Sequence, residues 1–152
     1  MNRIVVSCAA LLALSACQPG DHGPTDVPGN AQDHQPFNGI GEGETVRFLG
    51  TEPFWNGQVK GTVLTYKDVE MPKEEVATVK RFAGRNGLSF TGTVNGEAFD
   101  MTVTPGECSD GMSDRGFPFT VTLSIGPKGG DRAIRNGCAW SDKQPFTGPE
   151  AP

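Results

Sequence analysis

The sequence predicts an all-β fold, in which about eight short strands form a small antiparallel meander barrel or a sandwich, held by one disulfide. Polar and apolar residues alternate with a period of two in several segments. The chain of 152 residues contains 21 glycines and 12 prolines, which divide it into short pieces. No segment has the periodicity of an amphipathic helix, so the expected elements are strands joined by tight turns.

The clearest strand signal lies between Phe117 and Ile125, where five apolar residues alternate with Pro, Thr and Ser. This pattern is typical of a strand with one buried face, and residues 99–104 repeat it. Asn-Gly pairs at 86–87 and 95–96 predict tight turns. Further strands are expected at residues 45–49, 54–61, 62–66, 76–82, 88–93 and 132–139, and residues 72–75 are expected to add one helical turn.

The first 16 residues have the features of a bacterial lipoprotein signal peptide. Arg3 is followed by an almost wholly apolar stretch at 4–14, which is too short to cross a hydrocarbon core of roughly 30 Å. Residues 14–17, Leu-Ser-Ala-Cys, match the lipobox pattern, so Cys17 is the expected lipidation site. Two or three acyl chains would anchor the protein firmly in a membrane. The alternative is an ordinary secretory signal in which Cys17 is incidental.

The rest of the chain divides into three parts. Residues 17–43 combine the lipidated cysteine with a flexible tether that is poor in apolar residues. Residues 44–143 are long enough for one β-barrel-like domain. Residues 144–152 are rich in Pro and predict a loose tail, from which Phe146 could pack back. Gln18 after the cysteine favours the periplasmic face of the outer membrane over retention in the inner membrane.

Cysteine usage predicts one disulfide. Cys8 would be discarded with the signal and Cys17 would carry lipid, which leaves Cys108 and Cys138. An oxidising periplasm favours a bond between them, and closing a loop of about 30 residues would contribute roughly 3–4 kcal/mol. A free or metal-binding pair is the alternative, but the sequence has no CxxC motif and no histidine nearby.

Charge and composition argue against several functions. The formal net charge of −5 disfavours nucleic acid or anionic lipid as a partner. Both histidines, His22 and His34, lie in the tether, so a Ser-His-Asp triad and a metal site are not expected. No glycine loop has phosphate-binding spacing. We therefore expect a non-catalytic protein without a cofactor, with paired carboxylates as the remaining enzymatic alternative.

Residues 50–55, Gly-Thr-Glu-Pro-Phe-Trp, form the first candidate site. Adjacent strand residues point to opposite faces, so either Phe54 or Trp55 should face solvent. An exposed aromatic ring beside the Glu52 carboxylate would suit a binding surface. Alternatively, both rings fill one end of the barrel and Glu52 caps a backbone amide.

Residues 108–115, Cys-Ser-Asp-Gly-Met-Ser-Asp-Arg, form the second candidate. Such Ser and Asp side chains commonly bond local backbone amides, which gives a structural alternative to a ligand loop. Asp110 and Asp114 lack the regular oxygen spacing of an EF-hand calcium loop. The candidate binding surface from both segments comprises Glu52, Phe54, Trp55, Asp110, Met112, Ser113, Asp114 and Arg115.

These two segments, together with Phe117-Pro118 and the Gly-Cys-Ala at 137–139, resemble the motifs of an uncharacterised family of Gram-negative envelope lipoproteins. The resemblance covers the whole expected domain and implies a small β domain in the envelope, without an established activity. Similar domains occur with lipoproteins of the heat-shock META type and with membrane-bound inhibitors of C-type lysozyme. This chain lacks the Ser-Gly-containing signature loop of those inhibitors.

The resulting hypothesis is a lipid-anchored envelope lipoprotein whose non-catalytic domain binds an unknown periplasmic ligand or protein. One alternative is inhibition of a basic lysozyme by this acidic domain, because complementary charge would speed their encounter. Another is a purely structural role in the envelope.

Overall fold

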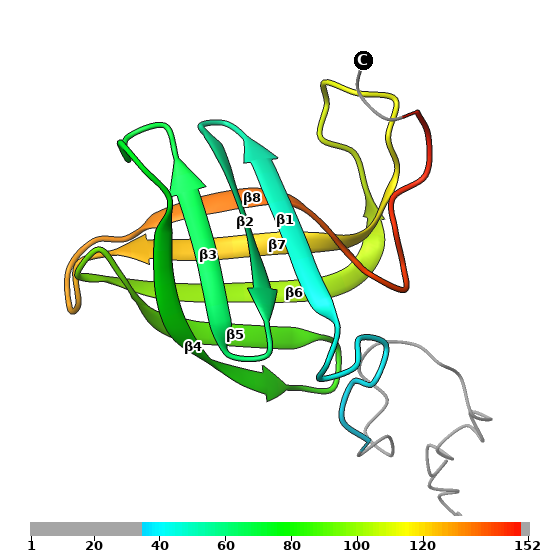
Figure 1. Cartoon of the computed structure of the whole chain (residues 1–152), viewed down its shortest axis with the longest axis horizontal. Coiled ribbons are helices and arrows are strands. Elements are labelled where there is room, and N and C mark those ends of the chain that lie inside the picture. The colour runs from blue at the N-terminus through cyan, green and yellow to red at the C-terminus, as the bar shows by residue number, and fades with distance from the viewer. Residues whose placement is uncertain (1–34, 150–152) are drawn as a thin grey trace, which may run out of the picture.

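The computed structural model describes residues 35–149, which form a closed antiparallel barrel of eight strands (Figure 1). Each strand pairs with the next along the chain, and the last pairs with the first. The strands are β1 (Thr45–Thr51), β2 (Phe54–Lys60), β3 (Val63–Asp68), β4 (Glu75–Ala83), β5 (Leu88–Val94), β6 (Glu97–Cys108), β7 (Phe117–Gly126) and β8 (Ala133–Ser141). The predicted all-β meander is confirmed, and it closes as a barrel.

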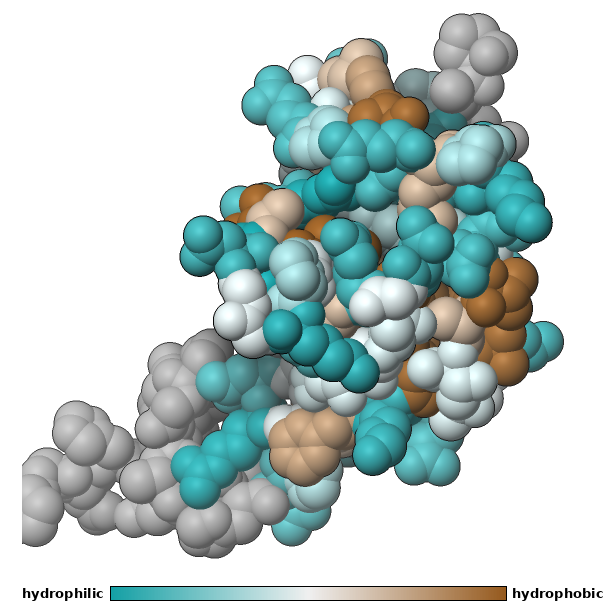
Figure 2. Space-filling view, turned by 90° about the vertical axis from the view of Figure 1, so that its left-hand side faces the viewer, coloured by the Kyte–Doolittle hydropathy of each residue, from teal (hydrophilic) through white to brown (hydrophobic). Residues whose placement is uncertain are grey.

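The predicted signal peptide at 1–16, the lipidation site Cys17 and most of the tether lie outside the described residues. Within residues 35–149, no helix is long and apolar enough to span a bilayer. On the face drawn in Figure 2, hydrophilic residues dominate the surface and apolar residues form scattered patches.

The eight expected strands all form, with ends that differ by a few residues. The helical turn predicted at residues 72–75 is wrong, because this stretch is a bend and β4 already begins at Glu75. Glu75 pairs with Tyr66 across the β3–β4 ladder, which holds it in an extended conformation. Both Asn-Gly pairs lie in tight connections as predicted, and Asn95 and Gly96 have φ angles of 48° and 82°. Positive φ at both central residues matches the type I′ turn that suits hairpins.

Alternating apolar side chains fill the barrel interior. Four aromatic rings, those of Phe48, Trp55, Tyr66 and Phe99, lie in sequence across it, with successive centroids 5.6, 6.4 and 5.6 Å apart. Each of these side chains is at most 1% exposed. A barrel of this strand number is just wide enough for side chains to fill, so the interior is a packed core.

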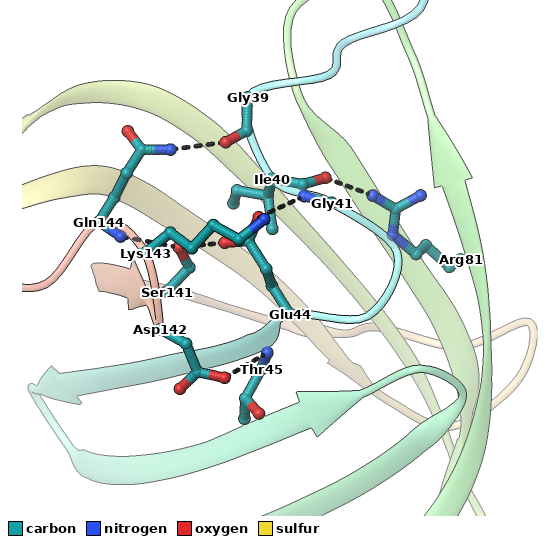
Figure 3. A network of polar contacts seen from close by, with 10 residues as sticks. All are labelled: Gly39, Ile40, Gly41, Glu44, Thr45, Arg81, Ser141, Asp142, Lys143 and Gln144. Carbon is teal, nitrogen blue, oxygen red and sulfur yellow. Dashed lines mark hydrogen bonds and ion pairs between the residues drawn. The ribbon is translucent and has the colours of Figure 1, made fainter.

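An N-terminal segment, residues 37–44, packs against the end of the barrel where β1 begins (Figure 3). Ile40 is 1% exposed and belongs to the core. Its carbonyl accepts a hydrogen bond of 2.8 Å from Arg81 Nη2 on β4. The Glu44 carboxylate accepts the Gly41 N–H at 2.8 Å. The folded domain therefore starts before residue 44, the boundary predicted from composition, because one apolar residue in a polar stretch enters the core.

The C-terminal residues close the same end of the barrel. Ser141 Oγ donates to Glu44 Oε2 at 2.7 Å, and Gln144 Nε2 donates to the Gly39 carbonyl at 2.6 Å (Figure 3). Lys143 Nζ lies 3.4 Å from Glu44 Oε1. The Gly41 N–H and the Ser141 hydroxyl, with help from Lys143, hold the pKa of Glu44 below its ordinary value.

The tail predicted to be loose from residue 144 is ordered as far as residue 149. Phe146 packs against Phe117 and Trp140, at centroid distances of 5.7 Å to each. Thr147 and Gly116 exchange backbone hydrogen bonds of 3.0 and 2.8 Å. Aromatic packing and a β-bridge outweigh the local preference of a Pro- and Gly-containing stretch for disorder.

Candidate functional site

The two motif segments singled out in the sequence meet in space. Thr51 Oγ1, at the end of β1, donates a 3.2 Å hydrogen bond to the Asp110 carbonyl in the β6–β7 connection. Both segments border one hollow of about 380 Å³, which we call the motif groove. Its lining comprises Leu49, Gly50, Thr51, Cys108, Ser109, Asp110, Thr120, Val121, Thr122, Asn136 and Gly137.

The motif groove lies where the pairing between β1 and β8, which closes the barrel, comes to an end. The β1–β8 ladder ends at the pair Leu49 and Cys138, whereas β1 continues to pair with β2 as far as Thr51. Gly50 and Gly137 flank this point. An added Cβ at Gly50 would lie 2.1 Å from Trp55 Nε1, and one at Gly137 would lie 2.0 Å from the Leu49 carbonyl oxygen. Only glycine fits at both positions, because a Cβ at either one would collide with the buried Trp55 indole or with the backbone of β1.

A disulfide fixes one wall of the groove. The predicted bond between Cys108 and Cys138 is present, with Cα atoms 5.6 Å apart. It joins the end of β6 to β8, two strands that are separated in the sheet by β7. The β6–β7 ladder shifts register between Pro105 and Cys108. This irregularity and the disulfide together hold the connection at residues 109–116, which we call the hairpin arm, beside β1 and β8.

Replacing Cys108→Ser and Cys138→Ser together is expected to lower the free energy of unfolding by about 2–5 kcal/mol. The bond closes a loop with a sequence separation of 30, so its loss frees the unfolded chain and releases the hairpin arm. Urea unfolding measures the loss, and hydrogen exchange should show reduced amide protection at residues 109–116. Wild-type protein in a reductant serves as the control and should lose the same amount. Unchanged urea midpoints in both samples would contradict the expectation.

Asp110 organises the hairpin arm through local hydrogen bonds. Its Oδ1 accepts the N–H groups of Met112 at 3.0 Å and Ser113 at 2.8 Å. Its Oδ2 accepts the Ser113 hydroxyl at 2.8 Å. Burial would raise the pKa of Asp110, but these hydrogen bonds and the nearby Arg115 charge outweigh it and hold the pKa below its ordinary value. The local capping of backbone amides, one of the two interpretations of this segment, is observed for both Asp110 and Ser113.

The first motif divides between core and surface. Trp55 is 1% exposed, so its predicted place on a binding surface is wrong. Phe54 is 54% exposed, which confirms that one of the two rings faces solvent. Trp55 turns inward because its position on β2 is in phase with buried Val59. Phe54 and exposed Glu52 do not line the motif groove, and the Phe54 carbonyl accepts the Val69 N–H at 3.2 Å instead.

The remaining predicted residues lie on the hairpin arm. Met112 is 68% exposed, and Asp114 is exposed as well. The Arg115 guanidinium lies 4.4 Å from the centre of the Phe146 ring, and its Nε donates to the Pro149 carbonyl at 3.0 Å. These contacts attach the arm to the C-terminal residues. Of the predicted candidates, Asp110 alone is among the residues that line the motif groove.

The groove residues on β7 and β8 were not among the predicted site residues. Thr120, Thr122 and Asn136 face outward, opposite in phase to the buried residues of their strands. Thr122 Oγ1 donates to Asn136 Oδ1 at 3.3 Å. These residues are the polar members of the alternating strand pattern. That pattern identifies every solvent-facing strand position equally, so it could not single out the ones that line a groove. Asp110 is the one ionisable side chain of the lining, so the groove offers mainly hydroxyl and amide groups.

A buried polar cluster lies inside the barrel. Arg135 Nη1 donates to both the Tyr66 hydroxyl and Asp68 Oδ2 at 2.8 Å, and the Tyr66 hydroxyl donates to Asp68 Oδ2 at 3.2 Å. Burial raises the pKa of Tyr66 above its ordinary value. Burial opposes the charged forms of Asp68 and Arg135, yet their mutual hydrogen bond and attraction lower the pKa of Asp68 and raise that of Arg135. Each charge is compensated within the cluster, which makes it a structural element of the core.

No set of three or more His, Cys, Asp or Glu residues within the described chain is arranged to hold a metal ion. No protein-family model, curated protein or solved structure matches this chain. The motifs and geometry of the chain itself are therefore the guide to its function.

Proposed function

We propose that this protein is a lipid-anchored lipoprotein of the cell envelope, held at the periplasmic face of the outer membrane. Its barrel binds a periplasmic protein or small ligand through the motif groove, without catalysing a reaction. One observation carries the proposal: Thr51 and Asp110, 59 residues apart in the chain and in different motifs, meet at one hollow.

The anchoring part of the proposal depends on the Leu-Ser-Ala-Cys pattern at residues 14–17. The described domain begins 18 residues after Cys17, at Gln35. At about 3.5 Å per residue, the intervening chain can reach at most roughly 60 Å from the membrane surface. Such a connection leaves the side of the barrel, where the motif groove lies, accessible to partners in the periplasm.

The binding part of the proposal is supported by the rigid surroundings of the groove. Two lining residues, Gly50 and Gly137, are closely packed against Trp55 and β1, and one wall is fixed by the disulfide between Cys108 and Cys138. A preformed site lowers the entropy that a protein loses when it binds. Hydroxyl and amide groups around Leu49 provide a few directed polar contacts beside an apolar one, which is typical of ligand sites.

Site-specific photo-crosslinking in living cells tests the groove. A photoreactive benzophenone amino acid at Thr122 should form adducts, whereas the same group at Thr91, an exposed position on β5, should not. Intact-mass spectrometry detects both protein and small-molecule adducts. Filling the groove with Thr120→Trp should abolish the adduct at position 122. Equal labelling from both positions, or labelling that survives Thr120→Trp in a folded protein, would refute groove binding.

The anchor is tested separately with Cys17→Ser in the full-length chain. The wild-type protein should incorporate radioactive palmitate and sediment with outer membranes, and the variant should do neither. A variant that is still acylated would refute the assignment of Cys17 without bearing on the groove.

A further inference from the structure

A second hollow, of about 360 Å³, lies on the other side of Leu49 from the motif groove. We call it the Trp140 hollow. It belongs to the outer face of four adjacent strands and the β3–β4 connection. Its lining comprises Arg47, Phe48, Leu49, Asn56, Gly57, Gln58, Thr65, Glu74 and Trp140.

The strand register places the polar and aromatic groups of this hollow in one row. Trp140 pairs with Arg47, Arg47 with Gln58, and Gln58 with Thr65, across β8, β1, β2 and β3. Asn56 lies one outward position along β2 from Gln58. Neighbouring strands are about 4.8 Å apart, so the row spans roughly 14 Å, a length that suits several linked rings.

The Trp140 side chain has a fixed orientation. Its ring centroid lies 5.5 Å from that of Phe117 and 5.7 Å from that of Phe146, which meets it edge-on at 84°. Arg115 in turn covers Phe146 at 4.4 Å. Trp140 is only half-buried by these neighbours, so part of its indole faces the hollow. A ring that is already immobilised loses little further entropy when a ligand stacks on it.

The polar groups around the indole have hydrogen-bonding capacity to spare. Asn56 and Gln58 are exposed, and neither amide has a hydrogen-bond partner among residues 35–149. Each amide offers two N–H donors and a carbonyl acceptor. Arg47 Nη1 lies 2.5 Å from Asp142 Oδ1, so the Arg47 charge is compensated. The other N–H groups of the guanidinium can still donate to a ligand. That hydrogen bond holds the pKa of Asp142 at about 2, which keeps the pair ionised at neutral pH.

We propose that the Trp140 hollow binds a neutral glycan chain. The apolar C–H face of one sugar ring stacks on the Trp140 indole, because aromatic side chains present a large apolar surface. Sugar hydroxyls donate to and accept from the amides of Asn56 and Gln58, which can serve both functions at once. A neutral ligand fits because the Arg47 charge is already compensated and the exposed Glu74 carboxylate can accept hydrogen bonds from sugar hydroxyls. This site is separate from the motif groove, so the glycan proposal can be tested independently of the proposed function.

The test uses the full mature lipoprotein in detergent micelles, titrated with tetra-N-acetylchitotetraose. This probe is uncharged, and its acetamido groups add amide donors and acceptors. The indole N–H resonance of Trp140, assigned with Trp140→Phe, should shift during the titration, while that of buried Trp55 should not. The double variant Asn56→Ala/Gln58→Ala should weaken binding about tenfold, because it removes hydrogen bonds to the sugar.

The matched control is Thr91→Ala/Thr93→Ala, two exposed polar residues on β5, which should leave the affinity unchanged. Three results would overturn the proposal. The first is the absence of a shift at about 10 mM sugar. The second is an unaltered affinity in Asn56→Ala/Gln58→Ala, which would place the sugar elsewhere. The third is a shift with a hexaproline peptide and none with the sugar, which would assign the indole to peptide recognition.

Discussion

The variant Arg135→Met is expected to lower the free energy of unfolding by about 3–5 kcal/mol, measured by urea unfolding at pH 7. The side chains of Arg135 and Asp68 are only 10% and 6% exposed. Removing the guanidinium leaves the Asp68 carboxylate and the Tyr66 hydroxyl buried without their shared donor. The loss reflects this uncompensated buried charge rather than a missing contact alone.

Two further variants separate this explanation from a general packing defect. Asp68→Leu combined with Arg135→Met replaces the pair by apolar groups and should recover much of the stability. Arg47→Met breaks an ion pair whose partner Asp142 is exposed, and it should shift the urea midpoint far less. A double variant as unstable as Arg135→Met would contradict the buried-charge explanation.

The same variant should show an altered dependence on acid. The folded-state pKa of Asp68 lies below the ordinary value of 3.8, so the pair contributes stability above pH 3.8 and loses it as the pH falls through the folded-state pKa. In Arg135→Met, burial without the cation favours the protonated carboxyl. The stability difference between wild type and variant should therefore shrink as the pH is lowered from 7 toward 3. A constant difference would contradict it.

Trp55→Ala is expected to cost about 3–5 kcal/mol, because the indole is buried at the centre of the aromatic row and its removal leaves a large cavity. Trp55→Phe should cost clearly less. The indole Nε1 is buried with no hydrogen-bond partner among the described residues, so phenylalanine forfeits no polar contact. Urea unfolding of both variants measures the difference.

Phe54→Ala is the matched control for Trp55→Ala, since Phe54 is adjacent in sequence and more than half exposed. It should change stability by no more than about 0.5 kcal/mol. If Trp55→Phe were as damaging as Trp55→Ala, the indole N–H would have to form a bond that matters for stability.

The strands could be predicted because alternation records which side of each strand is buried, as between Phe117 and Ile125. Closure as a barrel depends on β1 pairing with β8, a contact between distant segments that leaves no local pattern. Ile40 was missed for a related reason. A single apolar residue among polar ones has no period, and only the folded barrel provides the site it fills.

The candidate site was predictable only in part. Both motifs were recognisable, but their meeting depends on the register shift between Pro105 and Cys108, which redirects the hairpin arm. Strand parity required one of Phe54 and Trp55 to face inward, without deciding which one. The close packing at Gly50 and Gly137 arises where β1 and β8 meet, and the sequence of neither strand alone records it.

If the domain is anchored to a membrane as proposed, the contacts of residues 37–44 have a mechanical consequence. Tension from such an anchor would be transmitted through Phe37, whose N–H donates to the Gly84 carbonyl at 2.7 Å in the β4–β5 connection. Further along, the Ile40 carbonyl accepts a hydrogen bond from Arg81 on β4, and the Gly39 carbonyl accepts one from Gln144 after β8. These hydrogen bonds would thus divide the tension between opposite sides of the barrel before it reaches β1. Pulling on the anchor would shear several contacts at once instead of peeling the first strand from its neighbours.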